Sequence, residues 1–306
     1  MQLLPAFRRM PAHIRREAIE GYLFIMPWLV GLVLFVVGPI IVSFYLSLTD
    51  YEVIRPPTFV GLRNFDQLVN DRLFWQALKV SSIYVFASVP MGLALSFAVA
   101  LLMNQKVRFV SLWRTVYYIP TLVPVIASTM LWLWIFNPEF GLLNMMLALV
   151  GIDGPLWLGH TRWALPSLIL MSLWTVGAPM LIYLAGLQGI PTDLYEAAEI
   201  DGAGVWVKFR SVTIPMMTPV IFFNLVINMI ASFQIFVQPF IMTEGGPRYA
   251  TLFYVLYLYQ NAFQFFRMGY ASALAWVLFA VILVLTIVVF RSSALWVYYE
   301  GELRQR

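Results

Sequence analysis

The sequence lacks cysteine and carries little charge. Its 306 residues include no cysteine, which excludes disulfides, thiolate metal sites and a cysteine nucleophile. Charged residues make up 11% of the chain, hydrophobic residues make up 61%, and the mean hydropathy is +0.82. Soluble domains usually carry about 25% charged residues. The composition therefore predicts a protein of the lipid bilayer.

Residues for phosphate, metal or acid–base chemistry are also scarce. The chain has three lysines, Lys79, Lys106 and Lys208, and none follows the G-x-x-x-x-G spacing of a phosphate-binding loop. His13 and His160 fall in segments predicted on opposite sides of the membrane, so they cannot share a metal site. We therefore predict no catalytic residues, no metal and no cofactor on this chain.

Six charge-free runs, each longer than the roughly 20 residues that cross hydrocarbon, predict an all-α membrane protein with six core transmembrane helices. The predicted spans cover about residues 21–48, 78–104, 114–137, 163–187, 214–242 and 268–291. Together they form one transmembrane domain over residues 21–292, between an N-terminal arm (1–20) and a tail (293–306).

Two shorter apolar stretches are not predicted to cross. Phe140–Ile152 is too short for the hydrocarbon layer. Tyr249–Phe266 holds eight aromatic residues together with Gln260, Asn261 and Gln264, a composition typical of an interfacial helix.

Positive charge orients the predicted spans. Twelve of the 19 Lys and Arg residues fall on the side that holds both termini, and seven fall on the other side. Because bases collect in short cytoplasmic segments, both termini are predicted to be cytoplasmic. The net charge of +4 therefore reflects topology and gives no reason to expect nucleic-acid binding.

No acidic or basic side chain occurs in the six charge-free runs themselves, which are Gly21–Thr49, Val80–Gln105, Thr115–Pro138, Trp163–Thr192, Ser211–Thr243 and Met268–Phe290. Ion-coupled carriers usually keep such residues within their spans, so this absence weakens, without excluding, an ion-coupled secondary transporter. A sodium site built from carbonyl and hydroxyl oxygens would still be compatible with the sequence. A membrane-embedded enzyme would need a cluster of acids, histidines or metal ligands at one depth, and the sequence offers none.

The loop between the fourth and fifth spans, residues 188–213, is rich in charged and small residues. Asp193 followed by Glu196 is typical of a capped helix start. Gly202 and Gly204 would let the chain turn before a second amphipathic stretch, Val205–Val212. The small side chains leave one surface open to another protein. The alternative is an ordinary capped helix on the membrane surface.

The loop contains the sequence EAAEIDGAG (196–204), and nine residues separate its Gly202 from the sequence VTIP (212–215). This pattern resembles the E-A-A loop of permease subunits from ATP-binding-cassette importers. Val212 and Ile214 are mild departures from the family's I-x-L-P ending. The resemblance implies that the loop forms a coupling helix seated on an ATPase subunit. The implied coupling positions are Glu196, Ala197, Ala198, Asp201, Gly202 and Gly204.

Three further motifs, FVGLRNF (59–65), TEGGP (243–247) and YQNAF…MGYASALA (259–275), resemble the sugar-importer branch that contains the maltose and glycerol-phosphate permeases. The resemblance implies a second, maltose-G-like permease, an ATPase dimer that holds ATP and Mg²⁺, and an extracytoplasmic solute-binding protein. It also implies a sugar or polyol substrate and a location in the inner membrane, surrounded by lipid. The first outer loop is shorter than in the maltose protein, so maltose specificity is not implied.

Polar residues recur along the fifth span. Four amides lie within about a third of the circumference of an ideal helix, and they are Asn224, Asn228, Gln234 and Gln238. With Ser232 they would suit a neutral polyol, because amides and hydroxyls donate and accept hydrogen bonds without a buried charge. The alternative is that they join packed helices. The family resemblance implies substrate contacts near Asn228, Ser232 and Ile235, and around Trp174, Thr175 and Gly177 of the fourth span. The ring of Trp174 could stack on the apolar face of a pyranose, or it could equally serve in packing.

Overall fold

The computed structural model describes residues 12–105 and 108–298. The start of the predicted N-terminal arm and most of the predicted tail lie outside these residues. The described chain is mainly helical with almost no strand, which confirms the all-α fold class. One hairpin is present, in which β1 (Thr49–Asp50) pairs antiparallel with β2 (Thr58–Phe59).

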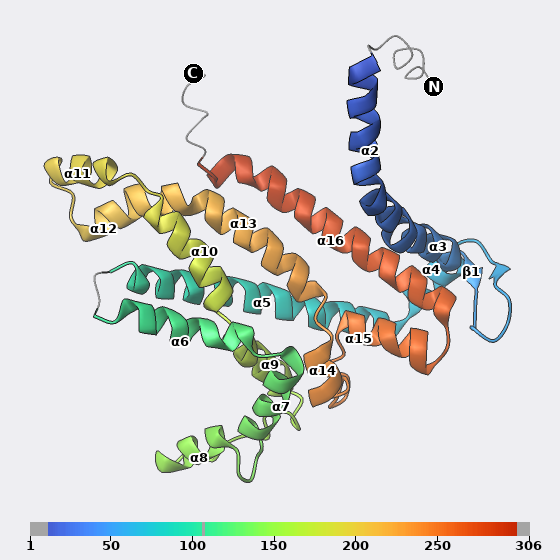
Figure 1. The fold of residues 1–306 in the computed structure, drawn as a ribbon. Helices are drawn as coiled ribbons and strands as arrows, with labels where there is room; N and C mark the ends of the chain where they lie inside the picture. The colour runs from blue at the N-terminus through green and yellow to red at the C-terminus, as the bar shows by residue number, and fades with distance from the viewer. Residues whose placement is uncertain (1–11, 106–107, 299–306) are drawn as a thin grey trace.

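Within the described residues, four helical stretches are long and apolar enough to cross a membrane, by length and composition: Ile19–Ser47, Arg72–Met103, Val205–Met242 and Met268–Trp296. Two bent helix pairs raise this number to as many as six if each pair is one span. Figure 1 shows α5 (Arg72–Met103), α13 (Ile214–Phe233) and α16 (Met268–Trp296) running lengthwise through the body.

The first stretch begins earlier than predicted. Helix α2 (Ala12–Leu32) continues through a π-helical turn, η1 (Val33–Val37), into α3 (Gly38–Ser47). The predicted arm is therefore helical from Ala12 onward. α3 packs on α16, whereas α2 projects away from the body, and none of its apolar window is buried within the described chain (Figure 1).

The third predicted span is broken by proline. α6 (Val110–Leu122) and α7 (Val125–Ile135) meet at 98°, so the region predicted as the third span is a bent pair of helices. Val123 precedes Pro124 and is extended, with φ −71° and ψ 127°, because the proline ring disfavours helical geometry in the preceding residue. The helix after it, α8 (Leu142–Leu149), has eight residues and is too short to cross, as predicted.

The fourth predicted span is also two helices. α9 (Ala164–Ser172) and α10 (Gly177–Gln188) are bent by 43° at a break of four residues. Pro179 has no amide hydrogen to donate to the carbonyl four residues earlier, at Thr175, which explains why the helix does not continue through this point.

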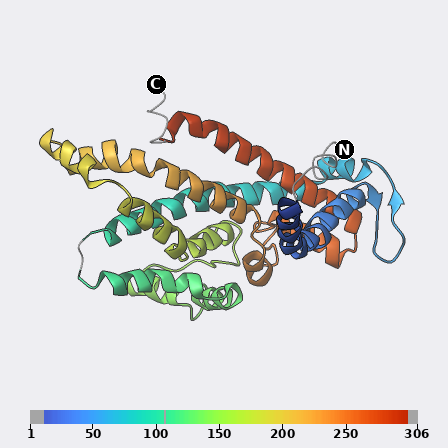
Figure 2. The same cartoon turned by 45° about the horizontal axis from the view of Figure 1, so that its top comes forward.

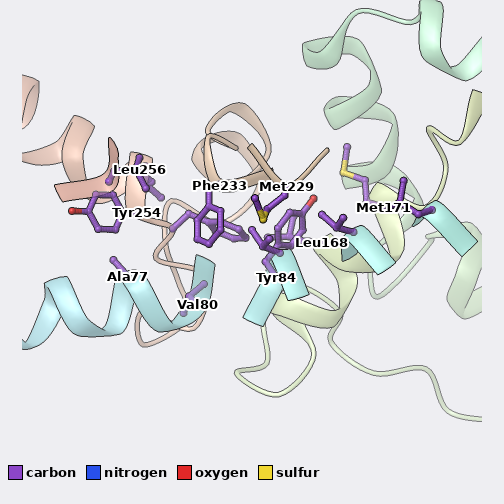
Figure 3. Packing of buried hydrophobic residues seen from close by; sticks show 14 of the residues in the cluster. Ala77, Val80, Tyr84, Leu168, Met171, Met229, Phe233, Tyr254 and Leu256 are labelled. Atoms are coloured by element: carbon purple, nitrogen blue, oxygen red, sulfur yellow. The ribbon is translucent and has the colours of Figure 1, made fainter. Parts of the chain in front are cut away.

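α5 is the centre of the core. It packs against α9, α10, α13 and the short helix α15 (Tyr254–Tyr259). Figure 3 shows Tyr84 of α5 among Met229 and Phe233 of α13 and Leu168 of α9, all of them buried. Side chains from four helices therefore meet along one face of α5.

The aromatic segment 249–266, predicted as an interfacial helix that does not cross, is helical only in part. Its helical part is only α15 and the π-helical turn η3 (Gln260–Gln264), which is too short to cross a bilayer. Tyr254, Leu256, Tyr257, Asn261 and Ala262 are buried against protein. The segment is thus part of the packed core, although Phe263, Phe265 and Phe266 remain exposed.

The FVGLRNF and MGYASALA motifs meet at the hairpin end of the molecule. Asn64, on α4 (Arg63–Asn70), donates from Nδ2 to the carbonyls of Ser47 and Thr49, both at 2.8 Å. The amide of Gly269 donates to the Tyr51 carbonyl at 3.1 Å, and a Cβ at Gly269 would lie 2.1 Å from the Thr49 carbonyl oxygen. The two motifs therefore join the first and last spans.

A carboxylate joins two further segments at this end. Asp71 caps α5 by accepting from the Leu73 amide at 2.8 Å, and it also accepts from the phenols of Tyr257 and, at 2.7 Å, Tyr270. Burial would raise the pKa of Asp71, but the hydrogen bonds from the phenols and from the amides of Leu73 and Phe74 together lower it below its usual value. The same contact and burial raise the pKa of Tyr257 to about 12.

We predict that Asp71→Asn lowers the stability of the detergent-purified protein at pH 7 by about 1–2 kcal/mol, since the anion is the form that the four donors favour. A carboxyl group with a lowered folded-state pKa contributes this stability above its unfolded pKa and loses it as the pH falls through the folded value. The difference in thermal midpoint between wild type and variant should therefore shrink below pH about 4.

Asp66→Asn is the matched control, because Asp66 is an exposed acid on the neighbouring helix α4. It should change the midpoint little at either pH. An equal midpoint for wild type and Asp71→Asn at pH 7 would contradict the role of the cluster.

Candidate functional site

A cavity of about 530 Å³ lies among α5, α6, α7, α9, α10, α13 and α14 (Val237–Met242). Its polar lining consists only of neutral side chains: Tyr84, Ser88, Ser96, Thr121, Ser128, Ser172, Thr175, Asn228, Ser232, Gln234 and Gln238. Within the described residues, no acid, base or histidine lines this cavity. The cavity can therefore form hydrogen bonds with a neutral solute without a compensating charge.

Three helix breaks converge on the cavity. Val123 and Val125 flank the break between α6 and α7, and Thr175 and Val176 belong to the break between α9 and α10. The third break follows α13, where Gln234 leaves helical geometry at φ −100° and ψ 11°. Non-helical backbone at membrane depth is tolerated where it lines a cavity or is buried in protein. The cavity thus accommodates the non-helical backbone of the three breaks, and the breaks in turn form part of the cavity wall.

Five of the predicted pathway residues line this cavity: Thr175, Asn228, Ser232, Gln234 and Ile235. Asn228 uses its Nδ2 to donate to the Asn224 carbonyl at 2.8 Å. Gln234, Ile235 and Gln238 reach the cavity from the break and from α14, because α13 ends at Phe233. The expectation of one continuous polar helix face is therefore wrong, although the structure still brings most of those side chains together.

The other three predicted pathway residues do not line the cavity. Asn224 is buried and donates to the Val220 carbonyl at 3.0 Å. Trp174 packs edge-on against Trp132, with ring centroids 6.1 Å apart. Gly177 lies where α10 touches α6, and a Cβ there would meet the Tyr117 carbonyl oxygen at 2.5 Å.

Sequence reasoning missed the hydroxyls on the other helices, which are Ser88, Ser96, Thr121, Ser128 and Ser172. One signal was available. Ser88 and Ser96 are eight residues apart, which places them about 80° apart around an ideal helix. The hydroxyls of Ser128, Ser172 and Thr121 follow no such spacing, since they come from different helices.

The second candidate site is the loop between α10 and α13. It contains α11 (Thr192–Ile200), α12 (Val205–Lys208) and a π-helical turn, η2 (Phe209–Thr213). Figures 1 and 2 show α11 and α12 projecting at one end of the molecule, while the hairpin lies at the other end. A short helix in this loop was predicted, and α11 is that helix.

Gly202 forms the turn after α11. Its φ is +78°, its amide donates to the Glu199 carbonyl at 3.0 Å, and the Ala203 amide donates to the Ala198 carbonyl at 2.8 Å. This pair of bonds is the Schellman arrangement that ends helices at a left-handed residue, usually glycine. The glycine of the motif is thus required by the backbone geometry.

The start of α11 differs from the capping prediction. The helix begins at Thr192 after Pro191, and no side chain caps it. Asp193 instead lies within the first turn, where a negative charge interacts favourably with the positive end of the helix dipole.

The loop is ordered by few contacts and exposes apolar side chains. Lys208 Nζ lies 2.6 Å from Glu199 Oε1, and the hydroxyls of Tyr195 and Thr213 are 3.0 Å apart. Ile200, Val205 and Trp206 are 87%, 80% and 79% exposed. The predicted coupling residues Glu196, Ala197, Asp201, Gly202 and Gly204 are exposed and Ala198 is half-buried, so all six lie on or near this surface.

Residues 88–297 match the family of binding-protein-dependent transport system inner membrane components. The chain belongs to this family of ATP-binding-cassette transporter permeases. It is 41% identical to the probable ABC transporter permease protein YesP of Bacillus subtilis, over 94% of this chain and 95% of that protein. It is 35% identical to the trehalose/maltose transport system permease protein MalF of Thermococcus litoralis, over 89% and 93% of the two chains.

The fold also resembles a solved structure. A chain in the crystal structure of a bacterial alginate ABC transporter, in complex with an alginate pentasaccharide-bound periplasmic protein, superposes with a TM-score of 0.81. The match covers 92% of this chain and 96% of the other at 23% identity, so it supports the fold alone.

We predict that Gly177→Ala destabilises the protein by about 1–3 kcal/mol, because the new methyl group would meet fixed backbone atoms of Tyr117 and Tyr118 on α6. The thermal unfolding midpoint in detergent measures this effect. Gly159→Ala is the control, since its Cβ would lie 3.6 Å from the Leu156 side chain, an ordinary contact. Equal midpoints for the two variants would show that α10 has room to move away from α6.

Proposed function

We propose that this chain is a permease subunit of an ATP-driven importer for a sugar or related polyol. The family membership supports the importer class, and the carbohydrate class is supported by the trehalose/maltose relative and by one observation on this chain. That observation is the neutral cavity, whose polar lining consists of seven hydroxyl and four amide or phenol side chains that can hydrogen-bond a polyhydroxyl solute.

The chain would form half of the translocation pathway. Its partners would be a second homologous permease, an ATPase dimer that binds ATP and Mg²⁺, and an extracytoplasmic solute-binding protein. Both termini and the α11–α12 loop would lie in the cytoplasm, with the hairpin and α4 outside. This chain would make or break no bond, and its role would be to open the cavity alternately to either side.

The loop has a direct helical connection to the cavity wall. α12, η2 and α13 run without a gap from Val205 to Phe233 and carry Asn228 and Ser232 to the cavity, and α14 follows after the break at Gln234. On its other side, the loop follows α10, whose first turn adjoins Thr175 and Val176. Closure of an ATPase dimer beneath the loop would therefore act on two walls of the cavity at once, as rigid elements carry displacement between sites.

The function is tested by purifying the tagged chain in gentle detergent, identifying the copurifying proteins by mass spectrometry and reconstituting the complex in liposomes. An importer subunit brings a second permease and two ATPase copies, and its uptake requires ATP. A chain that purifies alone or as a homodimer and takes up solute along an ion gradient would be a secondary transporter.

We predict that Gly202→Asp and Glu196→Lys each reduce ATPase copurification and ATP-dependent uptake at least tenfold while membrane insertion stays intact. Aspartate tolerates the left-handed backbone of Gly202, so this variant keeps the turn and adds charge and bulk at the proposed contact. Glu52→Lys is the matched charge reversal, on the exposed hairpin loop at the opposite end, and should leave both measurements unchanged. Normal uptake by both loop variants would rule out docking at α11.

A further inference from the structure

One aromatic ring of α5 contacts both helical stretches that flank the α11–α12 loop. Phe97 stacks on Phe209 of η2, with ring centroids 6.4 Å apart and an angle of 30° between the rings. The same ring meets Tyr183 of α10 edge-on, at 5.3 Å and 70°. Aromatic pairs prefer such offset and edge-to-face arrangements, which stabilise packing beyond the apolar area that they bury. Phe97 therefore joins η2 and α10 to the central helix of the core.

This contact gives the loop a side-chain route to α5. The loop is continuous with α10 on one side and with α12, η2 and α13 on the other, whereas α5 lies between α4 and α6 in the chain. Trp206 of α12 is 79% exposed and packs edge-on against Phe209 at 5.9 Å. Ring contacts thus run from the exposed surface of the loop through Phe209 to Phe97.

The contact lies between the loop and the cavity. On α5 the cavity lining ends at Ser96, and on α10 it ends at Pro179, so Phe97 and Tyr183 both follow on the side toward the loop. Tyr183 is fully buried, and Phe97 and Phe209 are half-buried. The three rings therefore meet where the cavity ends and the connection to the loop begins.

The helix that carries Phe209 is irregular at this residue. Phe209 begins the π-helical turn η2, and Thr213 ends it. Such turns are frequent at functional sites and are among the places where helices bend. The Thr213 hydroxyl lies 3.0 Å from the hydroxyl of Tyr195 on α11. One end of the turn is thus held against α5 and the other end against α11.

We infer that Phe97 is a positioning residue for transport, whose ring is a shared pivot for α10 and the α12–α13 stretch when α11 is displaced. The inference rests on the proposed function and adds α5 to the coupling, beside the two helices that continue from the loop. With the ring in place, a displacement of the loop turns both helices about one point on α5 and moves their cavity ends. Without the ring, the same displacement is lost as sliding of these helices along α5.

The functional test uses Phe97→Leu in the complete complex, reconstituted in liposomes with its solute-binding protein. Leucine is apolar and favours a helix, but it lacks the ring. We expect ATPase copurification and basal ATP hydrolysis to stay within twofold of wild type. ATP-dependent uptake of a ¹⁴C-labelled mixture of neutral mono- and disaccharides should fall at least fivefold. A merely structural role would lower all three together, and Phe97→Tyr, which keeps the ring, should retain uptake.

Phe44→Leu is the matched control. The ring of Phe44 contacts Trp276 at 5.0 Å and joins α3 to α16, neither of which is continuous with the loop, so uptake should stay at the wild-type level. Phe209→Leu should lower uptake as Phe97→Leu does, and the double variant should be no worse than Phe97→Leu alone, because both changes break one contact. Wild-type uptake in either leucine variant, or additive losses in the double variant, would overturn the inference.

A second measurement does not depend on knowing the substrate. Because the chain has no cysteine, pairs of spin labels can be placed on introduced thiols while the three rings stay intact. Leu102→Cys/Val207→Cys reports the distance from α5 to the loop, and Met91→Cys/Ile227→Cys reports the distance from α5 to α13 nearer the cavity; all four side chains are exposed. Electron–electron double resonance compares the nucleotide-free complex with the complex in ATP and vanadate.

In the chain that keeps Phe97, both distances should change with nucleotide. In Phe97→Leu the change at the loop should persist, while the change nearer the cavity should fall to less than half. An unchanged response nearer the cavity would overturn the inference and leave the proposed function standing. If neither distance responds to nucleotide in the chain that keeps Phe97, the proposed function itself fails.

Discussion

An unpaired polar group is costly in hydrocarbon, and this constraint accounts both for the apolar composition of the chain and for the lining of its cavity. Backbone groups in a bilayer must be satisfied within helices, so any break in a span needs protein or a cavity around it. The three breaks of this chain meet at one place, and the side chains that line that place are neutral. A charge at this depth would need a partner, whereas hydroxyls and amides are compatible both with the apolar surroundings and with a polyhydroxyl solute.

Proline determines where two of the breaks occur. Pro124 holds Val123 in an extended conformation, and Pro179 leaves the Thr175 carbonyl without a helical donor. Pro215 and Pro219, by contrast, lie near the start of α13 and the helix continues past both. Proline alone therefore does not predict a break. The packing of the neighbouring helix matters too, as at Gly177, where α10 approaches α6 so closely that no Cβ fits.

Hydropathy predicted the apolar segments well, because spanning length and absence of charge are properties of one continuous run. Hydropathy did not predict the two bends, because an apolar run has the same hydropathy whether its helix is straight or bent in the middle. The turn at Gly202 followed from the sequence because a left-handed residue after a helix strongly favours glycine. The cap at Asp193 did not, because the N-cap is Pro191 and the helix starts two residues earlier than a cap at Asp193 would place it.

In the candidate cavity, too, some residues could be predicted from the sequence and others could not. Asn228 and Ser232 were predicted because they follow one another along a single helix, which periodicity detects. Ser96 and Thr121 lie on different helices, and only the tertiary contact of α5, α6 and α10 brings them to one cavity. Trp174 was assigned to the pathway by resemblance, yet its ring packs on Trp132. Residues joined only by packing are beyond sequence reasoning.

The loop and the cavity are linked because the loop is inserted between two helices that both end at the cavity. α10 runs from the break at Thr175 and Val176 down to Gln188, and the stretch from Val205 returns to the break at Gln234. These helices also pack on each other and on α5. A displacement of α11 along the helix axes therefore cannot be absorbed by one helix alone. In the proposed coupling it would shift both broken ends relative to α5, and those ends carry Thr175, Ser232 and Gln234. The helix breaks thus have two consequences from one cause: they bring polar side chains to the cavity, and they divide its walls into separate helical segments.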